Sequence, residues 1–199
     1  MTDKQRSDTR KTLNSLAIVI GCLLLAGAVW IVIAQADFSV KQSAAHVVSV
    51  MNELVPEKKR SLPETHYGNN MPSAEIGGED FVGLIEIESY GCLLPVAMEW
   101  NPTELDRFPA AYSGSIYDRN LLIGGSNREG QFYFVDEIEI GTSVRFTDLY
   151  GRVFYYEVSM VNHADSIENI TSDEDDLTLF AKSKTTSKYV IIRCRLSNM

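Results

Sequence analysis

The sequence predicts a mostly β domain of barrel or sandwich type, carried behind one N-terminal transmembrane helix. The first observation is an uncharged apolar stretch, Leu16–Ala34, near the start of the chain. The second is a series of short apolar runs from residue 76 onward, separated by turn residues. The chain has 199 residues, which is enough for one domain of ordinary size and a short appendage.

The apolar stretch is long enough to cross a membrane, because a helix rises about 1.5 Å per residue and the hydrocarbon core is about 30 Å thick. The preceding residues carry more basic than acidic side chains: Lys4, Arg6, Arg10 and Lys11 against Asp3 and Asp8. The positive-inside rule therefore predicts a cytoplasmic tail over residues 1–15, a single-pass signal anchor over residues 16–36, and a main domain outside the cell membrane.

A cleaved signal peptide is the alternative, because Ala34-Gln35-Ala36 resembles a cleavage site. The apolar run is longer than the usual core of a signal peptide, which favours the uncleaved anchor. In either case the main domain leaves the cytoplasm.

The composition excludes several classes of function. The formal net charge of −9 argues against nucleic-acid binding, whose affinity comes from neutralising phosphates. Three cysteines are too few for a disulfide scaffold and are not spaced as zinc ligands, so we expect no metal site and no cofactor. A weak calcium site at the acidic run Asp173–Asp176 is a less favoured alternative to a solvated loop.

Residues 37–75 are expected to form a juxtamembrane helix and a linker. Apolar side chains recur at helical spacing before Pro56, at Phe38, Ala44, Val47, Val48, Met51, Leu54 and Val55. Residues 57–75 are polar and contain proline and glycine, which is typical of a linker. The simplest interpretation is a spacer helix between the membrane and the main domain.

The main domain, residues 76–199, contains six or more predicted strands. They are Phe81–Ile87, Leu93–Ala97, Asn120–Gly125, Ser143–Thr147, Val153–Val158, Leu177–Phe180 and Tyr189–Leu196. Gly151 stands at a turn position that needs a positive φ, which predicts a β-hairpin over residues 143–158. Many short strands with little helix predict a barrel or a sandwich.

The order of these segments resembles that of the sortases, the membrane-anchored cysteine transpeptidases of Gram-positive bacteria. The resemblance covers roughly residues 80–196. It is carried by Gly83–Ile87 with Leu94-Pro95-Val96, Tyr112–Ser115 with Asn120–Ile123, Phe132–Gly141, the hairpin, and Leu177-Thr178-Leu179. It implies a closed, sortase-like β-barrel with short helices and an active groove at one wall.

The residues that the resemblance assigns to catalysis are all replaced. Ser126 stands where the family has its histidine, Lys182 where it has the nucleophilic cysteine, and Lys188 where it has an arginine. A sortase needs a thiolate nucleophile, a proton donor for the leaving amine and a donor for the oxyanion. Because lysine would form a stable amide and serine is no general acid near neutral pH, we expect no sortase chemistry.

Two other arrangements could supply a nucleophile. In the family fold Ser126 and Lys182 would face each other, and a serine beside a buried lysine is a known nucleophile–base pair. Cys194 lies between two arginines, a weak indication of a lowered thiol pKa. A buried thiol, or a pairing of Cys194 with Cys92, fits the pattern as well. We expect neither arrangement to be catalytic.

These observations favour a membrane-anchored, catalytically inactive protein of a Gram-positive cell surface. Its barrel would bind a sorting-type peptide or a partner protein, or would regulate an active sortase. The alternative is a divergent active transpeptidase, or a Ser–Lys peptidase acting on the sorting signals of surface proteins. A structural module without a groove ligand is a third hypothesis.

Overall fold

The computed structural model describes most of the chain, namely residues 20, 22–28, 30, 42–55, 59–60, 70–103, 105–171 and 175–197. The chain divides into two compact units, Met1–Ser39 and Val40–Met199. The predicted cytoplasmic tail and much of the predicted anchor lie outside the described residues. Within the described ranges, no helix combines the length and the apolar character that a membrane crossing requires.

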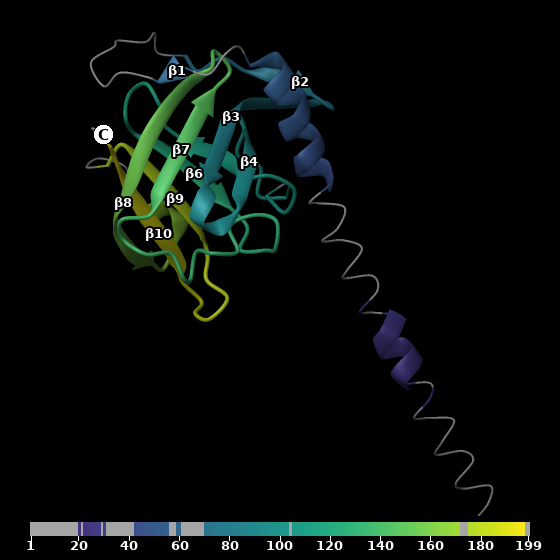
Figure 1. Cartoon of the computed structure of the whole chain (residues 1–199). Coiled ribbons are helices and arrows are strands. Elements are labelled where there is room, and N and C mark those ends of the chain that lie inside the picture. Colours follow the sequence, from purple (N-terminus) through teal and green to yellow (C-terminus); the bar gives the residue numbers. More distant parts are fainter. Residues whose placement is uncertain are drawn as a thin grey trace, which may run out of the picture. The chain divides into compact units, whose positions relative to one another are not determined.

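Eight strands in the described part of the second unit form a closed barrel (Figure 1). Their order around the ring is β3 (Glu79–Ile87), β4 (Cys92–Ala97), β5 (Ala110–Ser113), β6 (Leu121–Gly125), β9 (Leu177–Lys182), β10 (Tyr189–Leu196), β8 (Arg152–Ala164) and β7 (Ser143–Asp148). The ring closes because β7 pairs with both β3 and β8. Two short strands extend it, β1 (Lys59–Arg60) beside β8 and β2 (Ala74–Ile76) beside β3.

The predicted strands are confirmed, and they form a barrel rather than a sandwich. Each of the seven runs predicted from alternating apolar residues forms a strand. Gly151, at φ 77°, makes the predicted hairpin turn between β7 and β8. The short strands β1, β2 and β5 were not predicted, because two to four residues are too few to show a clear alternation.

The barrel interior is filled by the side chains at alternate positions of each strand. In β6 and β9, for example, Leu121, Ile123, Leu177 and Leu179 are fully buried in one large apolar cluster. Such a side chain stabilises the fold by about 1.5–3 kcal/mol relative to an exposed one. The intervening positions point to the outer face of the barrel, where the candidate site lies.

The helix over residues 42–54 differs from the spacer that the sequence predicted. Ala44, Val47 and Met51 lie along one face of it and are buried in the barrel's own apolar cluster. Met51 is completely buried. The helix therefore belongs to the second compact unit, because its apolar stripe has found a partner surface on the barrel.

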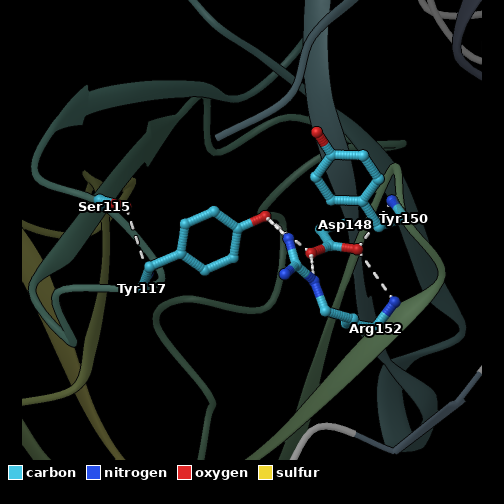
Figure 2. A network of polar contacts seen from close by, with 5 residues as sticks. All are labelled: Ser115, Tyr117, Asp148, Tyr150 and Arg152. Carbon is cyan, nitrogen blue, oxygen red and sulfur yellow. Dashed lines mark hydrogen bonds and ion pairs between the residues drawn. The ribbon is translucent and has the colours of Figure 1, made fainter. Parts of the chain in front are cut away.

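A polar network holds the β7–β8 turn (Figure 2). The fully buried carboxylate of Asp148 accepts the main-chain N–H groups of Tyr150 and Arg152, each at 2.9 Å. Its other oxygen accepts Arg152 Nε at 2.5 Å and the Tyr117 hydroxyl at 2.7 Å. The guanidinium lies 4.5 Å and 4.6 Å from the ring centroids of Tyr117 and Tyr150. Burial, followed by the contact with Asp148, raises the pKa of Tyr117.

Candidate functional site

The ends of two neighbouring parallel strands bring Ser126 and Lys182 together. Gly125, the last residue of β6, is in register with Ala181 of β9. Ser126 and Lys182 are the next residues along the two strands, and parallel neighbours lie about 4.8 Å apart. Each continues the series of outward-facing positions of its strand, after Gly124 in β6 and after Phe180 in β9. The backbone therefore places them at the same edge of the barrel, on neighbouring strands.

Lys188 comes to the same edge through the antiparallel pairing of β9 with β10. Tyr189 is in register with Lys182. One step further, the main-chain N–H of Ser183 donates to the carbonyl of Lys188 at 2.9 Å. All three predicted site residues thus lie at one end of three adjacent strands.

Ser126 is half-buried and is held by the loop over residues 98–109. Its hydroxyl donates to Asp106 Oδ1 at 3.3 Å. Its main-chain N–H donates to the side-chain oxygen of Gln131 at 3.1 Å. Gln131 is almost completely buried and donates to the carbonyl of Leu105 at 2.8 Å. The hydroxyl is therefore oriented toward an acidic loop residue.

The two lysines of the site are solvated. Lys182 is exposed at the end of β9. Lys188 is exposed as well, and its Nζ lies 3.1 Å from Asp165 Oδ1 in an exposed ion pair. A lysine acts as a base near neutral pH only when burial or a like charge lowers its pKa. The exposure of Lys182 therefore gives little support to a Ser–Lys catalytic pair.

Asp136, which sequence analysis did not identify, connects the segments that follow β6 and β9 by hydrogen bonds. It accepts the side-chain amide of Asn127 at 2.9 Å and the main-chain N–H of Lys184 at 3.0 Å. Partial burial alone would raise the pKa of Asp136. Hydrogen bonds from Ser183, Lys184 and Asn127 outweigh that effect and lower the pKa. An aspartate in a turn has no periodic pattern by which sequence analysis could find it.

Below Ser126 and Lys182, an aromatic cluster covers the outer face of β6 and β9. The Trp100 ring centroid lies 5.0 Å from that of Tyr112 and 5.5 Å from that of Phe180. Tyr112 and Phe180 meet edge to face at 5.6 Å. A Cβ atom at Gly124 would lie 2.2 Å from the Trp100 ring. Trp100 also comes from the loop over residues 98–109, so one loop both covers this face and contacts Ser126.

Neither thiol of the barrel lies at this site. Cys92 and Cys194 are buried, unpaired thiols on β4 and β10, which are not neighbours in the ring. Burial, and then the charge of Glu86, raises the pKa of Cys92 to about 12. Burial, and then the charge of Asp175, raises the pKa of Cys194. The indications of a lowered pKa and of a Cys92–Cys194 pairing are therefore wrong.

In the described part of the acidic run, both aspartates form ion pairs with arginines. Asp175 lies 2.5 Å from Arg193, and Asp176 lies 2.6 Å from Arg119. Asp173 and Glu174 lie outside the described residues. Among those that are described, no group of three or more histidine, cysteine or acidic side chains could hold a metal ion. Asp175 and Asp176 thus bind arginines.

Comparison with solved structures shows that this barrel has the fold of the sortases. It is similar to a sortase D5 transpeptidase of Clostridium perfringens, with a TM-score of 0.53 and 19% identity over 60% of this chain and 80% of that one. It is also similar to sortase A of Corynebacterium diphtheriae, with a TM-score of 0.54 and 16% identity over 82% and 85% of the two chains. No protein-family model and no curated protein sequence matches the chain. The protein therefore has the sortase fold, as the order of its motifs indicated.

Proposed function

We propose that the protein is a non-catalytic, sortase-like module of a Gram-positive cell surface, anchored in the membrane by residues 16–36. Its barrel binds an extended sorting-type peptide or a partner protein, or regulates an active sortase. The membrane location rests on the apolar stretch and on the basic tail that precedes it.

One observation is the main support for the proposal that the protein is not catalytic. The end of β9, where the resemblance places the nucleophilic cysteine, holds the exposed side chain of Lys182. Cys194, the nearest thiol along the pairing of β9 with β10, is in register with Leu177 at the other end of β9. A buried thiol with a raised pKa is not a nucleophile at neutral pH.

The other two positions also favour binding over chemistry. Ser126 offers no general acid, because a serine hydroxyl does not give up its proton near neutral pH. Lys188 forms an exposed ion pair with Asp165 and lacks the planar fork with which an arginine would hold an oxyanion.

A binding role is supported by the outer face of β6 and β9. Trp100 and Tyr189, which are partly exposed, cover the buried ring of Phe180 and give this face an aromatic surface beside the exposed Lys182. Aromatic groups of this kind bury large areas when they contact a ligand. Because Trp100 belongs to a loop, a ligand that displaces its indole would reach Phe180.

The test is to incubate the full chain, purified in detergent, with a library of sorting-type peptides and an amine acceptor. Mass spectrometry would follow cleaved and transferred products, and a parallel pull-down would report the peptides retained. We expect retained peptides and no new product. Trp100→Ala should change the retention, because the indole covers the proposed binding face.

Products that disappear in Ser126→Ala or Lys182→Ala would overturn the proposal and favour the divergent enzyme. If no product forms and no peptide is retained, the result would favour a role in which the barrel contacts a partner protein by another surface. Leu54→Ala is the control, because it removes an exposed apolar side chain on the helix over residues 42–54 and leaves the ends of β6, β9 and β10 unchanged.

A further inference from the structure

The strands β4 and β5 of the barrel are joined by very little main-chain pairing. Strand β4 pairs with β3 along its whole length, from Cys92 to Ala97. With β5, on its other side, it pairs only at Ala97, opposite Ala110. Over Cys92–Val96 the second edge of β4 therefore has no strand partner among the described residues.

The backbone alternation identifies the groups that this edge presents. The N–H of Ala97 donates toward β5, to the carbonyl of Pro109 at 2.9 Å. Since successive residues of a strand direct their main-chain groups to opposite sides, those of Leu93 and Pro95 point to the unpaired edge. This edge thus offers the N–H and carbonyl of Leu93 and the carbonyl of Pro95. Pro95 has no N–H, which is why a proline fits there.

An apolar cavity of about 610 Å³ adjoins this edge. One wall is the helix over residues 42–54, through Ala44, Ala45 and Val48. The other wall comes from the segment that contains Gln131 and Tyr133. Leu93 and Tyr133 are 38% and 40% exposed, so both present apolar surface beside the cavity. The edge and the cavity together form a groove with a hydrogen-bonding side and an apolar floor.

The rim of this groove is acidic. Glu129 lines it, and no lysine or arginine does so within the described residues. Tyr90, which also lines it, has a pKa raised first by burial and then by the charges of Glu139 and Glu137. Glu88, at the start of the 3-10 turn that precedes β4, is exposed but lies 3.6 Å from Arg145, so the acidic character of the rim rests on Glu129, Glu137 and Glu139. The field at the groove therefore favours a positively charged ligand.

We propose that the free edge of β4 is a docking site for an extended peptide segment of a partner, with apolar residues flanked by a basic one. The segment adds as a strand beside Leu93 and Pro95, and its apolar side chains enter the cavity. The site lies on the β4 wall, and the proposal does not depend on the function of Ser126, Lys182 and Lys188.

The test uses a fluorescein-labelled heptapeptide, acetyl-Arg-Val-Thr-Val-Thr-Val-Arg-amide, and the full chain in detergent. Fluorescence anisotropy would measure its dissociation constant. A peptide with glutamate at both ends should bind at least about tenfold more weakly, because the rim is acidic. A peptide with alternate N-methylated residues should lose binding, because it cannot pair with the edge.

The matching variant of the protein is Ala45→Trp, which fills the cavity from an exposed helix position and leaves the core intact. We expect it to weaken peptide binding at least about tenfold. His46→Trp is the control, because His46 is exposed and does not line the cavity. Leu93→Pro removes the N–H of the edge and should also weaken binding. Equal binding of the three peptides, or equal binding by Ala45→Trp and His46→Trp, would overturn the proposal.

Discussion

Trp100 packs directly on Gly124, so that a Cβ atom at position 124 would lie 2.2 Å from the indole atom Cζ3. The pair lies on the outer face of the barrel. Gly124 belongs to β6 and comes two residues before Ser126. A side chain at position 124 and the indole cannot occupy this space together. The glycine therefore allows a loop residue to cover the face on which the three predicted site residues lie.

Gly124→Ala should displace Trp100 from the outer face. The nearest atoms are two at the far end of the indole and one at the tip of the Phe180 ring, so these side chains move while the backbone of β6 stays in place. We expect a loss of about 1–3 kcal/mol in the free energy of unfolding, typical of an overpacked site. In a Trp30→Phe background Trp100 is the only tryptophan, and its emission should shift to longer wavelength.

Gly125→Ala is the matched control for that measurement. The three atoms nearest to a Cβ atom at position 125 all belong to Phe132, the first at 2.8 Å. This variant should lower stability and leave the Trp100 emission unchanged. An unshifted emission in Gly124→Ala would show that the indole does not depend on the glycine.

Asp148→Asn should be strongly destabilising. The carboxylate of Asp148 is fully buried and accepts Arg152, the Tyr117 hydroxyl and two main-chain N–H groups. Removing one partner of a buried ion pair leaves the other charge uncompensated, which costs about 3–5 kcal/mol. Urea denaturation of the full chain in detergent would measure the change.

Asp165→Asn provides the comparison, because it removes an exposed ion pair with Lys188. It should change the free energy of unfolding by less than about 1 kcal/mol. Equal effects of the two variants would contradict a structural role for the buried network.

The buried thiols predict a loss of stability at alkaline pH. Burial and the charge of Glu86 raise the pKa of Cys92 from its ordinary 9.0 to about 12, and burial also raises that of Cys194. Below pH 9 both thiols hold their protons in the folded and unfolded states, so their full contribution is present. From pH 9 upward the unfolded chain loses its thiol protons first, and stability falls by about 1.4 kcal/mol per pH unit for each thiol.

Denaturation curves at pH 7, 8, 9 and 10 would measure this slope. The variant Cys92→Ala/Cys194→Ala should show a flatter decline between pH 9 and 10, whatever its stability at pH 7. In a Cys22→Ser background, neither remaining thiol should react with a thiol reagent until the protein unfolds. Rapid labelling of the native protein at pH 8 would contradict the burial of both side chains.

The sequence predicted the strands well, because alternation of apolar residues reports directly on the inner face of a barrel. Sequence analysis failed for features that depend on contacts between segments far apart in the chain. The apolar stripe of the helix over residues 42–54 indicated burial but not the surface that covers it. The arginines beside Cys194 suggested a lowered pKa, yet neighbours in a strand point to opposite faces, so the thiol lies inside and they lie outside. Trp100 lies in a loop, where no periodicity reveals a contact with β6.

The variant Ser126→His/Lys182→Cys/Lys188→Arg tests whether the missing chemistry is the only difference from an active enzyme. The backbone already brings the three positions to the ends of β6, β9 and β10. With a thiol, an imidazole and a guanidinium at these positions, we expect measurable cleavage of sorting-type peptides. The histidine should make the triple variant at least about 100-fold faster than Lys182→Cys alone, which is the usual contribution of a general acid–base group. Single-turnover mass spectrometry of the acyl-enzyme would report it. No cleavage in a variant that folds normally would mean that the outer face under Trp100 has also lost the shape that positions a scissile bond.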